Sequence, residues 1–202
     1  MLRVGLTGGI ACGKSLIGRL FEERHVPVID DDVAARDAVS PGSEGLADVV
    51  AEFGEGILAP DGSLDRPALG KIVFADDGLR RRLMAITHPR IGALIAERFR
   101  AAEASVAPFV VYESALLIEN GNVDAWRPLV VVRTDRETQI ERMAGRNGLS
   151  REEAEDRIRS QMPVEEKAAL ADFVIDNSST TQHAANEFER VYAAVVERAS
   201  AD

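Results

Sequence analysis

The residues with the clearest chemical meaning are Gly8–Ser15, which match the phosphate-loop pattern G-x-x-x-x-G-K-[ST]. The apolar run Leu2–Leu6 precedes them and predicts a buried strand, and positions 16–21 carry apolar residues at helical spacing. Glycines in such a strand–loop–helix context let successive backbone N–H groups converge on one anion, and the helix start adds positive charge. The segment therefore predicts a phosphate site, with Lys14 on the β- and γ-phosphates and the Ser15 hydroxyl on Mg²⁺.

Carboxylates follow the second predicted strand. The short apolar run Val26–Ile29 ends in Asp30, Asp31 and Asp32. Because ligand crevices lie at the carboxyl ends of parallel strands, these acids should emerge on the same sheet edge as the phosphate loop. They could cap the helix that follows, or they could accept a proton from a hydroxyl substrate and help to hold magnesium. Alternation along an extended segment would direct Asp30 and Asp32 to one side and Asp31 to the other.

Three further apolar runs complete a predicted five-stranded sheet. The strand Pro108–Tyr112 ends at Glu113, a position typical of a Walker B carboxylate that holds magnesium or its water shell. Glu119 is a second acid in the loop that follows. The runs Leu129–Val132 and Asp172–Asn177 predict the fourth strand and the fifth strand with its exit loop. The fourth is almost entirely apolar, as expected of a parallel strand that is covered on both faces.

A long helical region separates the second and third strands. Residues 41–106 exceed a simple crossover, which indicates an inserted acceptor-binding subdomain. Ser43 and Asp65 are expected to cap two of its helices. A further helical pattern is interrupted at His88-Pro89, where His88 is either a functional or a purely structural side chain. Arg80–Arg82 fits a solvated helix face better than a phosphate contact.

Residues 135–170 predict two tightly joined helices rich in arginine. Arg142 and Arg146 lie four positions apart on one face of the first helix, which Gly148 ends. Ser150–Glu153 forms a capping box for the second helix. Such a pair is typical of a lid that closes over ATP and excludes water. The alternative is a solvated helix pair of mixed charge.

Composition limits the classes of partner. The 202 residues are 46% hydrophobic and carry a formal net charge of −10, which argues against a general nucleic-acid or anionic-membrane surface. Cys12 is the only cysteine, so the chain cannot form an internal disulfide. A reducing cytoplasm is therefore the default location. The first strand starts almost at Met1, so we expect no signal peptide, and no apolar run approaches membrane-spanning length. We expect a cytoplasmic monomer or weak homo-oligomer that binds small molecules, neither nucleic acid nor membrane.

The chain resembles the dephospho-coenzyme A kinase family from residue 4 to residue 178. The matching motifs are Leu6–Ile10 with Gly13–Ser15, Val28–Asp32 with Ala35-Arg36, Pro41-Gly42, His88-Pro89, Leu116–Glu119, Glu137–Gln139 with Arg142 and Arg146, Gln161, and Val174–Asn177. The resemblance implies transfer of the ATP γ-phosphate to the ribose 3′-hydroxyl of dephospho-coenzyme A, the last step of coenzyme A synthesis. ATP is then the co-substrate and Mg²⁺ the cofactor. A different small-molecule or nucleoside monophosphate kinase, and a nucleotide switch without an acceptor, are the alternatives.

Together the patterns and the resemblance imply an α/β fold of the P-loop NTPase class. It would have three α/β/α layers around a five-stranded parallel sheet, with a helical acceptor-binding insertion and a helical lid. We expect the nucleotide-binding core at residues 1–40, 107–134 and 171–202, the dephospho-coenzyme A subdomain at 41–106, and the lid at 135–170.

The resemblance also implies roles for single residues, with Asp32 as the proton acceptor and Lys14 and Arg142 as the other catalytic residues. The expected ATP-binding residues are Gly8, Gly9, Ile10, Ala11, Cys12, Gly13, Lys14, Ser15, Leu16, Arg142, Arg146 and Asn177. The expected acceptor-binding residues are Asp32, Arg36, His88, Leu116 and Glu119. Ser15 is the expected magnesium ligand, with Asp30 and Glu113 as further candidates.

Overall fold

The computed structural model describes residues 1–121 and 123–201, and it divides into two compact units. The first unit comprises residues 1–29 and the chain from residue 102 onward, and the second comprises residues 30–101. The sequence led us to expect the insertion at 41–106, so the second unit begins earlier than expected. Its boundary places Asp30–Asp32 in the second unit, whereas the phosphate loop belongs to the first.

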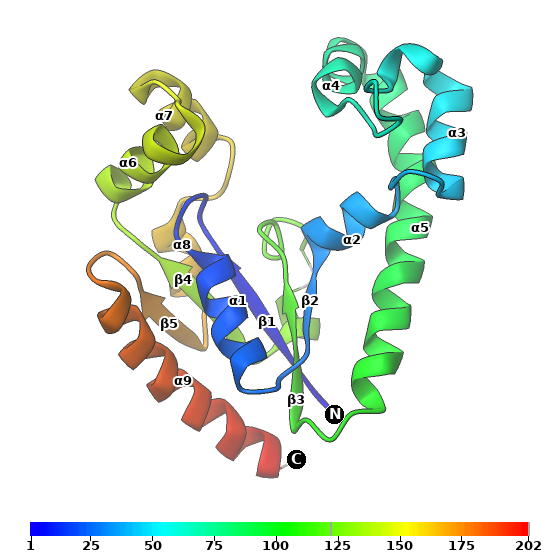
Figure 1. The fold of residues 1–202 in the computed structure, drawn as a ribbon. Coiled ribbons are helices and arrows are strands. Elements are labelled where there is room, and N and C mark those ends of the chain that lie inside the picture. Colours follow the sequence, from blue (N-terminus) through cyan, green and yellow to red (C-terminus); the bar gives the residue numbers. More distant parts are fainter. Residues whose placement is uncertain (122, 202) are drawn as a thin grey trace. The chain divides into compact units, whose positions relative to one another are not determined.

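The five strands form one parallel sheet in the order β2-β3-β1-β4-β5, as the sequence predicted (Figure 1). They are β1 (Leu2–Gly8), β2 (Val28–Asp30), β3 (Phe109–Glu113), β4 (Leu129–Arg133) and β5 (Phe173–Asp176). The central strand β1 pairs with both β3 and β4, in register from Leu2↔Phe109 to Leu6↔Glu113 on one side. Strand β1 thus has a buried neighbour on each edge, and its carboxyl end delivers the phosphate loop to the middle of the sheet.

Helices cover both faces of this sheet. Those of the first unit are α1 (Lys14–Glu23), the 3-10 helix η2 (Val123–Trp126), α6 (Arg136–Asn147), α7 (Arg151–Arg159), α8 (Val164–Ala169) and α9 (Thr181–Ala201). Phe109 and Tyr112 are three residues apart on β3, so their side chains leave opposite faces. Phe109 packs edge-on against Phe21 of α1 and near Tyr192 of α9, whereas Tyr112 stacks on Trp126 of η2 at 4.2 Å. Helices α1 and α9 therefore cover one face of the sheet and η2 covers the other, which gives the α/β/α layers.

Helix α8 lies on the same face as η2. Gly5 of β1 is the register partner of Tyr112, and Thr7 lies two residues after Gly5. The side chains of Thr7 and Tyr112 therefore point to the same face of the sheet, the one that η2 covers. The Thr7 hydroxyl and the buried Lys167 ammonium of α8 both donate to the carbonyl of Ala115, at 3.3 and 2.8 Å. Residues 164–169, which we expected within a mobile lid, are therefore packed on the sheet. The predicted helix pair is present in α6 and α7, with the Ser150 capping box formed.

The second unit is helical and has its own small core. Its elements are α2 (Asp31–Asp37), α3 (Glu44–Phe53), the 3-10 helix η1 (Glu55–Ile57), α4 (Arg66–Ala75) and α5 (Asp77–Glu103), the last of which ends in the first unit. Ser43 caps α3 and Asp65 caps α4, as predicted, each side chain accepting a backbone N–H. Val49 and Ile57 are fully buried in the core that these helices share.

The predicted helix break at His88-Pro89 is wrong, because α5 continues through it (Figure 1). Proline removes one backbone donor from the helix. Side chains next to it add bonds to the ladder: the Thr87 hydroxyl donates to the Leu83 carbonyl at 2.9 Å, and Arg90 Nη1 donates to the Ile86 carbonyl at 2.8 Å. Because helix formation is cooperative, the hydrogen-bonded turns before and after Pro89 in this helix of 27 residues keep the backbone at Pro89 helical.

Within residues 1–121 and 123–201, no helix combines the length and the apolar character needed to cross a membrane.

We predict that Phe21→Ala destabilises the fold by about 3–5 kcal/mol, because it leaves a cavity in the core. Phe21 is fully buried and meets Phe109 and Phe188 edge-on. The matched control is Phe74→Ala, since the Phe74 side chain is 87% exposed. Urea unfolding measures both variants. Equal losses of unfolding free energy would contradict the core packing described here.

Candidate active site

The phosphate loop needs two unusual backbone conformations. Gly13, which precedes the first residue of α1, has φ +90°, and Ala11 has φ +57°. Left-handed residues between right-handed ones make successive N–H groups point toward one centre. Gly13 has no substitute here, since a Cβ at this position would also collide with the Asn177 amide. The loop thus forms an anion cradle at the amino end of α1, where the helix dipole is positive.

Three consecutive carbonyls on the outer side of the loop each receive a side-chain donor. Gln139 Nε2 donates to the Ile10 carbonyl at 2.7 Å, and Arg142 Nη1 donates to the Ala11 carbonyl at 3.2 Å. The Asn177 amide donates to the Cys12 carbonyl at 2.8 Å. Since a peptide's carbonyl and N–H point in opposite directions, these bonds help to keep the loop's N–H groups facing the phosphate side.

Lys14 and Glu113 form an ion pair beside the loop. Lys14 Nζ lies 2.6 Å from Glu113 Oε1, and the Glu113 side chain at the end of β3 is 3% exposed. Gly18, one turn after Lys14 on α1, makes room for this carboxylate, because a Cβ there would collide with Glu113 Oε2. The predicted Walker B acid therefore does lie next to the lysine of the phosphate-loop motif. Its magnesium role stays a prediction.

A cavity of about 480 Å³ adjoins the loop on the side of α6. It is lined by Ala11, Gly13, Leu16, Arg142, Met143, Gly145, Arg146 and Asn177. Six of these eight were expected to bind ATP, and the exceptions are Met143 and Gly145. The Arg142 guanidinium forms part of the wall, because its second nitrogen donates to the Asn177 carbonyl at 2.9 Å. This cavity suits the nucleoside part of a nucleotide whose phosphates occupy the loop.

The acids at the end of β2 and the start of α2 are arranged differently from our prediction. Asp30 caps α2, its Oδ1 accepting the N–H groups of Asp32 at 2.8 Å and Val33 at 3.1 Å. Asp31 and Asp32 already belong to the helix, so the argument from alternation along an extended segment is wrong. Neighbouring side chains on a helix are about 100° apart. The cap was one of the two roles left open for these acids, and Asp30 fills it.

The remaining acceptor candidates are divided between the two units. Arg36 and His88 are exposed on α2 and α5 of the second unit, as is Asp32. Leu116 is exposed in the first unit, in the loop after β3. Glu119 is already engaged, because its Oε1 accepts from Lys167 at 2.7 Å and from the Met162 N–H at 3.2 Å. This ion pair of buried Lys167 with the partly exposed Glu119 carboxylate ties α8 to the β3 exit loop, and an acceptor contact by Glu119 stays a prediction.

The donor set fits a magnesium ion carried by the nucleotide. Mg²⁺ prefers hard oxygen ligands and commonly binds through one or two protein groups, phosphates and water. Ser15 places a hydroxyl in the first turn of α1. In the part of the chain that the structure describes, no group of three or more His, Cys, Asp and Glu side chains forms a ready-made cage. Ser15 and a nearby carboxylate could complete the shell around phosphate-bound magnesium.

Sequence reasoning gave no role to four residues that shape the site. Gln139 and Gln161 were noted only as motif positions, and Gly18 and Lys167 were not considered. Gln139 lies one helical turn before Arg142, and this spacing indicates that both side chains reach the same loop. Gly18 lies one turn after Lys14, where a missing side chain leaves room for a partner of the lysine. Such spacings are detectable in the sequence, but Lys167 gives no comparable signal.

A family model described as dephospho-CoA kinase matches residues 2–183. A dephospho-CoA kinase of Geobacter sulfurreducens is 50% identical over 190 residues, covering 94% of this chain and 96% of its relative. A dephospho-CoA kinase of Arabidopsis thaliana is 45% identical over 189 residues, covering 93% of this chain and 81% of its relative. Among solved structures, TT1252 from Thermus thermophilus aligns with a TM-score of 0.82 at 32% identity, covering 98% of this chain and 97% of the solved chain. Dephospho-CoA kinase from Campylobacter jejuni aligns at 0.70 with 28% identity, covering 96% of both chains.

Cys12 gives a pH-dependence prediction. Burial raises the pKa of its thiol from 9.0 to about 11, so the thiol stays neutral in the fold. The unfolded chain releases this proton near pH 9, whereas the folded chain retains it. Stability should therefore fall between pH 9 and 11, by about 2–3 kcal/mol at about 1.4 kcal/mol per pKa unit.

The measurement is urea unfolding at several pH values for the native chain and for Cys12→Ala, which lacks the titrating group. The difference between the two curves isolates the thiol from the lysines and tyrosines. Parallel pH dependence in the two proteins would show that the Cys12 pKa is not raised by the fold.

Proposed function

Since the chain belongs to the dephospho-CoA kinase family, we propose how its residues divide the work of that reaction. The enzyme transfers phosphate from ATP to dephospho-coenzyme A in coenzyme A biosynthesis, and the family's reaction at the ribose 3′-hydroxyl yields coenzyme A and ADP. Membership in the family disfavours the other kinases and the nucleotide switch considered above. The observation that carries the assignment of roles is the loop itself, with its carbonyls held from outside and Lys14 at its edge.

The loop and α1 hold the triphosphate. Backbone N–H groups and the amino end of α1 bind phosphate oxygens, and the Lys14 ammonium reaches the β- and γ-phosphates. Glu113 orients Lys14, because Glu113 Oε1 lies 2.6 Å from Lys14 Nζ. When bound, Mg²⁺ would supply charge neutralisation at the phosphates. Ser15 would hold the ion, with Glu113 or Asp30 orienting its water shell.

Arg142 and Arg146 act on the nucleotide side of the site. Arg142 is bonded to two backbone carbonyls, so its guanidinium is fixed at the wall of the nucleoside cavity. Arg146 lines the same cavity and is exposed. We assign to Arg146 the more mobile contact with ATP, and to Arg142 the double role of shaping the loop and contacting the nucleotide. Helices α6 and α7 form the lid that excludes water.

Asp32 accepts the proton of the ribose hydroxyl, and Arg36, His88 and Leu116 contact the acceptor. The supports are the family resemblance at these positions and the exposure of all four side chains. Asp32 has no capping duty, in contrast to Asp30. Magnesium dependence, a cytoplasmic location, and a monomer or weak homo-oligomer complete the proposal. An ADP-release assay with dephospho-coenzyme A beside adenosine, AMP and shikimate tests the acceptor class.

We predict that Lys14→Gln lowers kcat/KM by about 10²–10³, as expected for loss of one charge-stabilising donor. Glutamine can still donate to Glu113, so the buried carboxylate keeps a partner and the fold should persist. Lys71→Gln on α4 is the control, because Lys71 is exposed. Steady-state kinetics and circular dichroism measure both. Near-normal turnover by the Lys14 variant would remove the lysine from the mechanism.

We predict that Asp32→Asn lowers kcat by about 10²–10⁴, the range of a general base, with ATP affinity nearly unchanged. Asp31→Asn is the matched neighbour, since both residues lie in the first turn of α2, and it should resemble the native enzyme. Single-turnover kinetics and calorimetry with ATP separate chemistry from binding. If the Asp31 variant proves as slow as the Asp32 variant, the base must be reassigned.

A further inference from the structure

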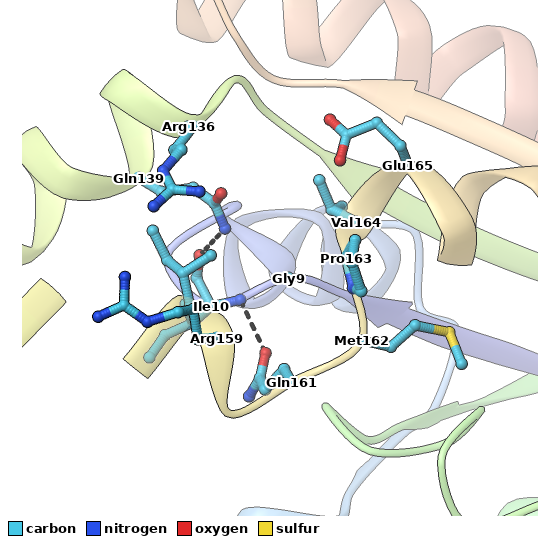
Figure 2. A pocket seen from close by; sticks show the side chains of 11 residues that line it. Gly9, Ile10, Arg136, Gln139, Arg159, Gln161, Met162, Pro163, Val164 and Glu165 are labelled. Atoms are coloured by element: carbon cyan, nitrogen blue, oxygen red, sulfur yellow. Dashed lines mark hydrogen bonds between the residues drawn. The ribbon is translucent and has the colours of Figure 1, made fainter. Parts of the chain in front are cut away.

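Ile10 in the phosphate loop is bonded on both sides by glutamines from outside the loop (Figure 2). The Ile10 N–H donates to Gln161 Oε1 at 3.1 Å, and the Ile10 carbonyl accepts from Gln139 Nε2 at 2.7 Å. A backbone N–H can only donate and a carbonyl can only accept. The roles of the two side chains are therefore fixed: Gln161 is the acceptor and Gln139 is the donor.

The two glutamines come from different parts of residues 135–170. Gln139 is buried in the first turns of α6, and Gln161 lies between α7 and α8. Their amides meet at one residue of the loop, beside a cavity of about 280 Å³ that both line, together with Gly9 and Arg159. Gly9 leaves the room for this approach, because a Cβ there would lie 2.9 Å from Gln139 Nε2.

The geometry has a consequence for the phosphate-binding groups. The two bonds hold the peptide groups on either side of Ile10, and the left-handed residue Ala11 follows directly. A rotation of these peptides would turn the next N–H groups away from the centre of the cradle. These hydrogen bonds link the lid helices to the phosphate loop through Ile10, in addition to the apolar packing of Ile10 against the small core of α6 and α7.

We propose that Gln139 and Gln161 are positioning residues for ATP, which set the phosphate loop in its binding conformation by donating to and accepting from the Ile10 backbone. This proposal rests on the proposed function of the loop as the ATP triphosphate site. The pair acts on ATP affinity through Ile10 and takes no part in the chemistry at the acceptor.

The test uses glutamate, which keeps the shape of glutamine but loses its donor. Gln161→Glu retains an acceptor for the Ile10 N–H, so the Kd and KM for ATP should stay within about threefold of native values. Gln139→Glu sets a carboxylate against a carbonyl, and both constants should rise at least about tenfold, with a smaller change in kcat. Both variants add the same charge, so the difference between them reports hydrogen-bond polarity.

A pH profile adds a readout that a merely structural role would not move. Burial, the Ile10 carbonyl and Glu165 should raise the pKa of the new carboxyl, against the opposing effect of the Arg136 and Arg159 guanidiniums that line the same cavity. Below that pKa the protonated carboxyl can donate again. The ATP affinity of Gln139→Glu should therefore recover as pH falls from 8 to 6, relative to Gln161→Glu measured at the same pH. Gln182→Glu on α9 adds the same charge at an exposed position and is the control.

Calorimetry with ATP, steady-state kinetics and thermal unfolding are measured for all variants. If Gln139→Glu does not fold, Gln139→Met and Gln161→Met replace the glutamates, and each should weaken ATP binding about tenfold through loss of one hydrogen bond. Equal ATP affinities of the two glutamate variants, or lower melting temperatures with unchanged ATP binding, would overturn the proposal. Failure of the native chain to bind ATP would instead overturn the proposed function.

Discussion

The phosphate loop depends on one constraint: a backbone that turns its N–H groups toward an anion must turn its carbonyls away from it. Those carbonyls need partners, because an unpaired buried carbonyl is costly. Here Gln139, Arg142 and Asn177 supply one donor each to three successive carbonyls. The placement of α6 and of the β5 exit loop follows from this need. The cavity that we propose for the nucleoside is lined by Arg142 and Asn177, so two of the side chains that shape the loop also shape this cavity.

The sheet provides the rigidity that this arrangement requires. Strand β1 is central and almost entirely buried beyond Arg3, and the neighbouring strands hold both of its edges. The loop therefore starts from a fixed point, and Glu113 arrives at the end of β3 within reach of Lys14. The two lysine–glutamate pairs, at 14/113 and 167/119, bracket the β3 exit loop. This loop carries Leu116, one of the proposed acceptor contacts.

Strong local patterns made most of the fold predictable from the sequence. The strand runs, the phosphate loop and the caps at Ser43 and Asp65 are determined by residues close in the chain, and the structure contains them. The differences came from local signals that allow two readings and from tertiary context. Pro89 stays within α5, and Asp31 opens a helix because Asp30 caps it. The raised pKa of Cys12 depends on burial that no local pattern reveals. The roles of Gln139 and Gln161 depend on hydrogen bonds spanning 129 and 151 positions.

The pair of Lys167 and Glu119 also bears on how the family's sequences can diverge. Lys167 is fully buried, and its charge is compensated by Glu119 and the Ala115 carbonyl. Loss of the Glu119 carboxylate alone would leave the buried lysine charge without its counter-charge, whereas loss of Lys167 would leave a carboxylate that is in part exposed to water. Evolutionary change should therefore reach position 167 before or together with position 119. Homologous sequences should keep a lysine at 167 only where an acid stands at 119.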